Sequence, residues 1–394
     1  MNLIVIGGGA AGIFAALAAK QAHPALSVLV LEKTAVLLSK VKVSGGGRCN
    51  VTHACFDPQQ LVKNYPRGEK ELLGPFHRFQ PRDTIEWFES RGVKLKTESD
   101  GRMFPVTDSS STIIDCLLSE ARKLGVEIRQ RQRVEKIEKG FIVHLKDSPA
   151  LNCTHLILAT GSSPEGYASA ESLGHTIQPP VPSLFTFNVP TSPLKELSGV
   201  SVEAATVDVG PFTQTGPLLI THFGFSGPAI LKLSAWGARF LHEKNYRTPF
   251  SINWIPKLSQ EELFRQLFQL KEQSPQKTLL SLNPFYLPKN LWKELLANDK
   301  TLANLSKKEL QDLSQKLHAD IYQMDGKTTH KEEFVTCGGV TLKEVDFKTL
   351  QSKICPRLYF AGEVLNIDGV TGGFNFQNAW TTGYIAGTSI YSVD

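Results

Sequence analysis

The feature that most constrains this fold is the glycine-rich segment at the start of the chain. Residues 2–20 read NLIVIGGGAAGIFAALAAK, which predicts a short apolar strand, a tight glycine turn and an alanine-rich helix. A second apolar strand at 26–33 carries Glu32, at the separation from Gly12 that is typical of a dinucleotide-binding β-α-β unit. We therefore expect an α/β fold with a Rossmann-like nucleotide-binding domain.

Each residue of this motif has a physical reason. Gly7 allows the tight turn, Gly9 lets the backbone approach a pyrophosphate, and Gly12 lets the helix pack closely on the strand. The free N–H groups at the start of the helix attract the anion. Glu32 can accept hydrogen bonds from ribose hydroxyls, and its negative charge disfavours a 2′-phosphate in the same pocket.

A second glycine-rich strand–loop–helix pattern, YFAGEVLNIDGVTGGFNFQNA, lies at residues 359–379. A dehydrogenase that binds only NAD does not need this second loop, whereas the long FAD molecule needs backbone for its flavin half. Gly362 and Glu363 can lie beside the ribityl and phosphate groups, and the helix start can direct its N–H groups at the flavin ring. The segment ATG at 159–161 supplies a third element. The sequence thus favours FAD over NAD as the tightly held cofactor, and it contains no second fingerprint for a dedicated NAD(P)H domain.

Several further elements follow from local patterns. A helix is expected at 112–124 with Thr112 as its cap, and a hairpin should turn at Lys139-Gly140. Short strands with Gly/Pro turns are expected in 201–209 and 216–234. Residues 259–322 read as helical, with one apolar stripe made of Leu310, Leu313, Leu317 and Ile321.

Composition narrows the class of protein. The formal net charge is +5 without a run of five like charges, so nucleic-acid binding is not favoured. The first residues do not resemble a signal peptide, and no apolar run reaches the ~18 residues that span a bilayer. The six cysteines and ten histidines show no metal-ligand spacing, so we expect no metal site. A cytoplasmic protein with reduced thiols and no membrane partner is the expectation; the oligomeric state stays open.

Five motifs together resemble a known family. They are GGGAAG (7–12), SGGGRCNVT (44–52), GRMFP (101–105), THFGFSGPAILKLS (221–234) and LYFAGEVLNIDGVTGGFNFQNAW (358–380). The chain resembles the bacterial flavoproteins that include aminoacetone oxidase and the bile-acid oxidoreductase of gut bacteria. The resemblance implies an FAD-binding domain formed by both chain ends (1–183 and 334–394), a β-rich insert (184–250) and a helical subdomain nested in that insert (251–333).

The motifs and the resemblance together give a set of candidate site residues. By resemblance, SGGGRCNVT passes along the flavin ring, with Arg48, Asn50 and Thr52 near the flavin or substrate. His222 could move a proton on the substrate side, or could be a histidine satisfied within its turn. Cys49 lacks a partner cysteine at relay spacing, so a packed thiol is favoured over a redox role. The candidate catalytic residues are Arg48, Asn50 and His222, and the candidate cofactor-binding residues are Gly7, Gly9, Ala10, Ala11, Gly12, Glu32, Lys33, Ser44, Gly45, Gly46, Gly47, Arg48, Asn50, Val134, Thr160, Gly161, Gly362, Glu363, Gly372, Gly373, Phe374, Asn375 and Phe376.

The function expected is that of an FAD-dependent oxidoreductase. It would act on a small organic substrate, with electrons passing through flavin N5 to oxygen, a nicotinamide or another acceptor. NAD(P)H as a transient electron donor or acceptor is left open. Two alternatives remain: an RNA-associated flavoprotein of the tRNA-modification type, and a non-catalytic flavin-binding scaffold. The sequence does not identify the substrate.

Overall fold

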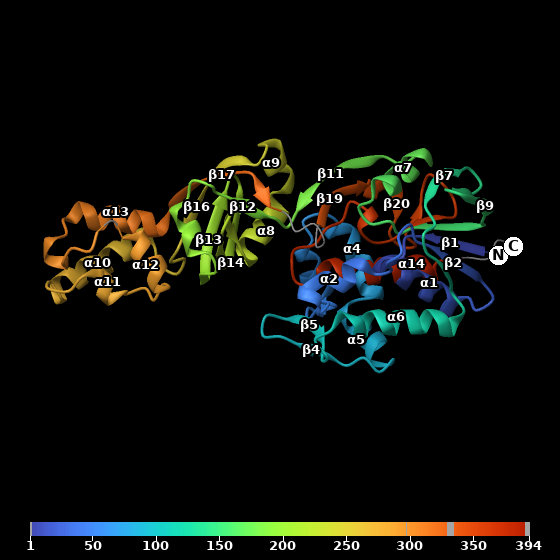
Figure 1. Cartoon of the computed structure of the whole chain (residues 1–394), viewed down its shortest axis with the longest axis horizontal. Helices are drawn as coiled ribbons and strands as arrows, with labels where there is room; N and C mark the ends of the chain where they lie inside the picture. Colours follow the sequence, from blue (N-terminus) through green and yellow to red (C-terminus); the bar gives the residue numbers. More distant parts are fainter. Residues whose placement is uncertain (1, 297, 329–334, 391–394) are drawn as a thin grey trace. The chain divides into compact units, whose positions relative to one another are not determined.

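A computed structural model describes residues 2–296, 298–328 and 335–390, and the chain divides into two compact units. The first unit combines the two chain ends, Met1–Val181 and Lys331–Asp394. The second unit is the intervening segment, Pro182–His330, which is coloured from green to orange in Figure 1. The expected three-part division, with its own boundary near 250, stays a prediction.

The first unit is built on a seven-stranded sheet in the order β20-β21-β22-β10-β1-β2-β6. The strands from β22 to β6 run parallel, with Val5 opposite both Val30 and Ile157. Because β1 and β10 are apolar on both faces, they form the buried centre of the sheet. The strands are β1 (Asn2–Ile6), β2 (Ser27–Leu31), β6 (Glu127–Arg129), β10 (His155–Leu158), β20 (Val345–Asp346), β21 (Gln351–Ser352) and β22 (Leu358–Phe360).

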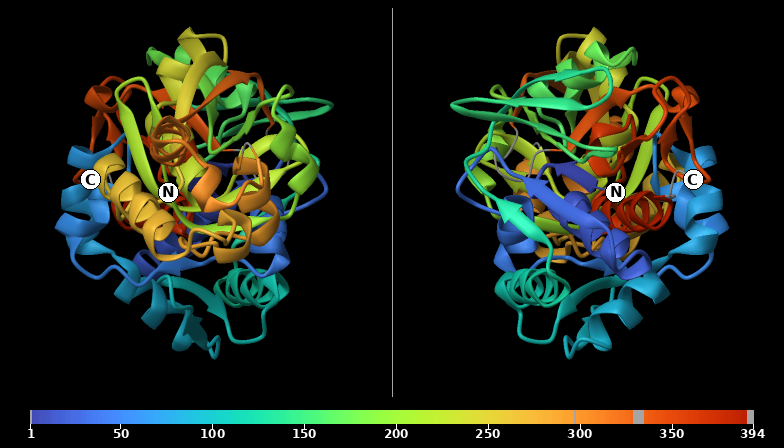
Figure 2. Two further views of the ribbon diagram at one scale, coloured as in Figure 1. Left: turned by 90° about the vertical axis from the view of Figure 1, so that its left-hand side faces the viewer. Right: turned by 90° about the vertical axis from the view of Figure 1, so that its right-hand side faces the viewer.

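Helices from the two ends of the chain, α1 (Ala10–Ala22) and α14 (Phe374–Thr388), pack against each other. The right-hand view of Figure 2 shows the blue N-terminal segments beside the red C-terminal helix. The contact is very close: a Cβ at Gly387 would lie 2.3 Å from the carbonyl oxygen of Ala15. Glycine in α14 and alanine in α1 therefore let the two backbones approach as no larger pair could.

The remaining elements of the first unit surround this sheet. Two three-stranded sheets have the orders β3-β5-β4 and β7-β8-β9, and β11 pairs with β19. Their strands are β3 (Thr52–His53), β4 (Leu95–Thr97), β5 (Arg102–Pro105), β7 (Val134–Glu138), β8 (Ile142–Leu145), β9 (Ser148–Asn152), β11 (Ile177–Ser183) and β19 (Val335–Val340). The helices are α2 (Ser39–Gly47), α3 (Pro58–Leu61), α4 (Glu69–Arg78), α5 (Pro81–Glu89), α6 (Ser110–Leu124) and α7 (Pro164–Ser172), with short 3₁₀ turns at Val62–Asn64, Leu342–Glu344 and Gly362–Val364.

The second unit contains a seven-stranded sheet in the order β17-β16-β13-β14-β15-β12-β18. One hydrophobic core runs from the sheet, through Phe225 and Trp254, into the helices around Trp292 and Leu310. The strands are β12 (Thr186–Asn188), β13 (Ser201–Val209), β14 (Phe212–Thr221), β15 (Gly224–Ser226), β16 (Arg247–Asn253), β17 (Asp320–Asp325) and β18 (Lys327–Thr328). The helices are α8 (Pro228–Trp236), α9 (Ala238–Glu243), α10 (Gln260–Gln273), α11 (Leu279–Leu282), α12 (Lys289–Leu295) and α13 (Lys307–His318), with 3₁₀ turns at Pro193–Leu197 and Leu302–Asn304.

Several predictions for these elements are confirmed, including the turn at Lys139-Gly140 between β7 and β8. Three are wrong. Helix α6 starts at Ser110 because Ser109, not Thr112, provides the cap by accepting a hydrogen bond from the N–H of Ser111. Residues 228–236 form α8 rather than a strand, since Pro228 stands at the first helical position, where its missing N–H is not needed. Ile321 leaves the apolar stripe because α13 ends at His318; on β17 its side chain is 74% exposed.

Candidate FAD site

The first glycine motif forms the expected strand–turn–helix. A Cβ at Gly12 would lie 1.9 Å from the carbonyl oxygen of Gly7, so the start of α1 has no room for a side chain there. A Cβ at Gly9, in contrast, would have no neighbour within 4 Å. Gly9 is also the N-cap of α1 and provides no side-chain hydrogen bond to it. The helix start is thus open above Gly9 and has N–H groups for an anion such as pyrophosphate.

The carboxylate of Glu32 is fixed at the end of β2. One oxygen accepts a hydrogen bond from the N–H of Gly8 at 2.8 Å, and the other accepts bonds from the N–H and hydroxyl of Thr34 at 2.8 and 2.9 Å. These contacts hold the carboxylate next to the glycine turn. Its expected role toward a ribose stays a prediction, and the geometry is compatible with it because a carboxylate can accept further bonds.

The next residue, Lys33, is connected to two other candidate positions by Glu165. The ammonium of Lys33 lies 3.0 Å from this carboxylate, and the guanidinium of Arg133, which precedes Val134, lies 3.2 Å from it. Hydrogen bonding by Ser163, together with Lys33, lowers the pKa of Glu165 to about 2, so the carboxylate is charged at neutral pH. Glu165 is in α7, which starts directly after the ATG segment, so this cluster joins three elements expected at the adenosine end.

The segment SGGGRCN turns sharply at its glycines. Gly45, Gly46 and Gly47 have φ values of 57°, 68° and 83°, which interrupt α2. A Cβ at Gly46 or Gly47 would have no neighbour within 4 Å, so this backbone presents an open face to a ligand. The null alternative of a closed, packed turn does not describe it.

Arg48 and Cys49 occupy different surroundings from this open face. The guanidinium of Arg48 lies 2.7 Å from Glu98 and 3.5 Å from Asp108, and it covers the ring of Phe104 at 4.0 Å. These contacts anchor Arg48 to its own side of the fold, and its catalytic role stays a prediction. Cys49 is buried, and burial raises the pKa of its thiol to about 12, which favours the packed-thiol interpretation.

Asn50 connects the two glycine-rich loops. With its amide oriented to satisfy both groups, its oxygen accepts a hydrogen bond from the N–H of Gly373 at 2.9 Å and its nitrogen donates to the carbonyl of Thr52 at 3.0 Å. Gly373 is the N-cap of α14 and provides no side-chain bond to it. Asn50 therefore holds the start of α14 beside SGGGRCN, as the sequence suggested for a flavin-facing helix.

The C-terminal loop also meets the first motif. A Cβ at Gly362 would lie 2.7 Å from the Cβ of Ala11, and the N–H of Gly362 donates to the hydroxyl of Thr382 at 2.8 Å. The start of α1 and the end of β22 are thus in direct contact. Head and tail of the chain surround one region at the carboxyl edge of the sheet, which is where ligands bind in open α/β folds.

Glu363 has partners that the sequence did not indicate. Its carboxylate lies 2.5 Å from the ammonium of Lys40 on α2 and accepts a hydrogen bond from the N–H of Thr336 at 3.0 Å. Lys40 and Thr336 were not among the candidate residues. A lysine four positions before Ser44 was the available pattern, but many exposed helices carry such a lysine, so spacing alone could not single it out.

The candidate cofactor residues at 7–12, 32–33, 44–50, 134, 160–161, 362–363 and 372–376 all belong to the first unit. His222 does not: it lies in the second unit, at the exposed turn between β14 and β15. Its catalytic role stays a prediction. No described helix is both long and apolar enough to cross a bilayer, and no metal-binding cluster of three or more His, Cys, Asp or Glu is found among the described side chains.

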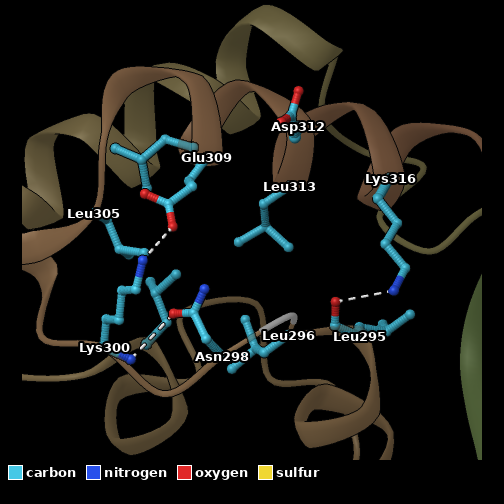
Figure 3. A pocket seen from close by; sticks show the side chains of 11 residues that line it. Leu295, Leu296, Asn298, Lys300, Leu305, Glu309, Asp312, Leu313 and Lys316 are labelled. Carbon is cyan, nitrogen blue, oxygen red and sulfur yellow. Dashed lines mark hydrogen bonds and ion pairs between the residues drawn. The ribbon is translucent and has the colours of Figure 1, made fainter.

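The second unit has a small hollow between α12 and α13 (Figure 3). Leucines, including Leu296 and Leu313, line it, and Lys300 pairs with Glu309 at its edge at 2.8 Å. Its volume of about 170 Å³ is below the ~300 Å³ at which ligand pockets begin. The open glycine face of the first unit is the better candidate for a cofactor.

Comparisons with known proteins agree with this site. The model of the HI0933-like protein Rossmann domain family matches residues 1–389. A Haemophilus influenzae protein named ribosomal RNA dihydrouridine synthase is 32% identical over 407 residues, and a Clostridium scindens protein named 3-dehydro-bile acid delta(4,6)-reductase is 30% identical over 408; each alignment covers 98% of both chains. The structure of 3-ketosteroid-delta4-(5alpha)-dehydrogenase from Rhodococcus jostii RHA1 has the same fold, with a TM-score of 0.51 at 13% identity over 98% of this chain and 96% of that one. The chain belongs to the HI0933-like Rossmann-domain family, and it is an FAD-dependent oxidoreductase.

Proposed function

We propose that this protein reduces a carbon–carbon double bond that is conjugated with a carbonyl group. The two curated relatives carry names for reactions of this kind, since a delta(4,6)-reductase and a dihydrouridine synthase both saturate a double bond. In the uracil ring that bond is conjugated with a carbonyl, as it is in an unsaturated 3-oxo steroid. Both names therefore describe addition of two hydrogen atoms to an electron-poor double bond.

The observation that carries this proposal is the contact between the two chain ends around one open, glycine-lined face. Gly362 lies against Ala11, and Asn50 fixes Gly373 at the start of α14. When bound, FAD supplies two-electron transfer through its N5 atom. The start of α14 has no side-chain cap, so its N–H groups favour negative charge that develops on the ring or on the substrate carbonyl.

The chain provides little acid–base chemistry near this loop, and little is needed. Asn50 positions the helix start, while Arg67 and Asp368 form an ion pair, with one nitrogen–oxygen distance of 2.6 Å, that fixes the loop before α14. One proton must reach the second carbon of the double bond, and His222 is the candidate donor that the sequence offers. The electrons would enter from NADH or NADPH, which balances the net reaction with one proton.

A small unsaturated ketone is the first candidate substrate. A uridine in RNA is the second, because a relative at 32% identity over 98% of this chain is named as an RNA-modifying enzyme. The net charge of +5 is compatible with RNA but does not favour it over a small molecule.

The test is an anaerobic reaction of the FAD-loaded protein. NADH or NADPH should bleach the flavin band, and 4-androstene-3,17-dione or unmodified ribosomal RNA should restore it, with two hydrogens gained by the substrate in mass spectrometry. Restoration by the ketone alone supports a small-molecule reductase, and restoration by RNA alone supports a uridine reductase. If a reduced, FAD-loaded protein is reoxidised by neither, nor by simpler unsaturated carbonyls, the proposed reaction is wrong.

A further inference from the structure

Three buried hydroxyl groups of the first unit have no hydrogen-bond partner among the described residues. They are Oγ1 of Thr160, the hydroxyl of Tyr167 and Oγ1 of Thr336. Buried polar groups are almost always paired, and an unpaired one costs about 1–3 kcal/mol. Three such groups from three separate elements call for an explanation, and a bound ligand with its own hydroxyl groups would provide one.

These hydroxyls gather around Glu363. Thr336 donates its N–H to the carboxylate, and a Cβ at Gly161 would lie 3.7 Å from it. Oγ1 of Thr160 packs against Gly166, directly before Tyr167, because a Cβ at Gly166 would lie 1.9 Å from it. Burial raises the pKa of Tyr167 far above its ordinary value, and the charge of Glu363 adds to the rise. Tyr167 is therefore a neutral hydroxyl that faces the neighbourhood of this carboxylate.

Glu363 itself has little capacity left. Its two oxygens already accept from Lys40 and from the N–H of Thr336. In the sequence it was the expected partner of the cofactor hydroxyls. The structure makes it the anchor of a polar cluster instead, so direct contacts to a ligand fall to the unpaired hydroxyls beside it.

The sheet order says which part of FAD these groups face. Along the carboxyl edge, Glu32 follows β2, Gly9 follows β1, Thr160 follows β10 and Glu363 follows β22, and these strands are neighbours in that order. The adenosine belongs at Glu32 and the pyrophosphate at Gly9. The next section of the cofactor, toward the flavin, is the ribityl chain, which carries three hydroxyl groups.

We propose that Thr160, Tyr167 and Thr336 form a hydroxyl-lined pocket that binds the ribityl chain of FAD. A polyol offers both donors and acceptors, so it can satisfy all three side chains at once. The inference goes beyond the proposed reaction and holds for either class of substrate.

The test compares Tyr167→Phe with the matched control Tyr359→Phe in the full chain. Tyr359 is also buried in the first unit, but its hydroxyl donates to the carbonyl of Ser389 at 3.2 Å. Removing the unpaired hydroxyl of Tyr167 should leave the Tm of the cofactor-free protein unchanged or raised. It should weaken FAD binding roughly tenfold, the effect of losing one good hydrogen bond. ADP, which lacks a ribityl chain, should bind as it does to the wild type.

The control should behave in the opposite way, with a lower Tm and unchanged FAD affinity. Thr160→Val and Thr336→Val should each repeat the selective loss of FAD over ADP. Equal FAD affinity in Tyr167→Phe and the wild type, or a matching loss of ADP affinity, would overturn the ribityl pocket alone. A wild-type protein that binds ADP and FAD but reduces no substrate would instead count only against the proposed reaction.

Discussion

At the scale of single residues, the same amino acid has different roles at neighbouring positions. Gly12 is required for packing, since a Cβ there would collide with the carbonyl of Gly7, whereas the space above Gly9 is free of protein atoms. Gly9 also has an extended backbone, with φ −85° and ψ −172°, that other residues adopt easily. Its small size is therefore needed for the cofactor, not for the fold.

This difference gives a first prediction. Gly9→Leu should fold with nearly the stability of the cofactor-free wild type but purify without the yellow colour of bound FAD, because its side chain fills the place of the pyrophosphate. Gly12→Ala should lose about 1–3 kcal/mol of stability through overpacking. Urea unfolding and the flavin absorbance of the purified proteins measure both effects. A Gly9→Leu protein that stays fully yellow would show that the pyrophosphate binds elsewhere.

A second residue-scale prediction concerns His175, which is buried between Glu344 and Ser352. Burial lowers its pKa, so the folded state resists a proton that the unfolded chain accepts near pH ~6.5. The stability that follows is present above that pH and declines as the pH falls below it. In thermal unfolding at pH 7.5 and 5.5, His175→Gln should lose less Tm on acidification than the wild type. The exposed control His77→Gln should lose as much as the wild type.

At the scale of elements, the loop before α14 is held by residues far away in the sequence. Asp368 is fully buried and pairs through both oxygens with Arg67, and the hydroxyl of Tyr65 donates to the carbonyl of Phe374 at 2.7 Å. The N–H of Val370 donates to the carbonyl of Asn64 at 2.9 Å. The segment after α3 thus clamps the loop and sets the direction in which α14 begins.

Asp368→Asn tests this clamp. Removing one charge of a buried pair should destabilise the protein by about 3–5 kcal/mol, because Arg67 is left without its counter-ion. The control is Asp100→Asn, which breaks the exposed pair with Arg102 and should cost at most about 1 kcal/mol. Urea unfolding provides the comparison. Equal losses in the two variants would mean that the clamp contributes no more than a surface contact.

At the scale of the whole molecule, the two units depend on chain continuity in different ways. The second unit is one uninterrupted segment with its own core around Phe225, Trp254 and Trp292. The first unit takes β22 and α14 from the C-terminal end, and α14 packs along α1. Its central sheet and its main helix pair are incomplete without both chain ends.

We therefore expect a fragment of residues 182–328 to fold alone, with a cooperative thermal transition and dispersed NMR signals. A fragment of residues 1–181 should stay unfolded, and co-expression with residues 331–394 should recover a complex that binds FAD. The result that contradicts this account is a folded, FAD-binding fragment 1–181, since it would show that β22 and α14 are dispensable.

Much of the candidate site could be predicted because its determinants are local. A strand, three glycines and an acid at a set spacing produce the same turn wherever they occur, so the placement of Gly7, Gly12 and Glu32 followed from the sequence. Local patterns failed where a boundary depended on the neighbours. The cap moved from Thr112 to Ser109, and Ile321 continued a helical period that the fold does not continue.

The sequence by itself determined the cofactor class and the α/β architecture, because glycine turns and apolar strands are dictated by backbone sterics over a few residues. Only the tertiary structure decided which side chains surround the cofactor region. Lys40, Thr336 and Tyr167 come from α2, β19 and α7, and nothing in their local sequence marks them as neighbours of Glu363. Such contacts arise from packing between distant segments, where many spacings are equally acceptable until the sheet order is fixed.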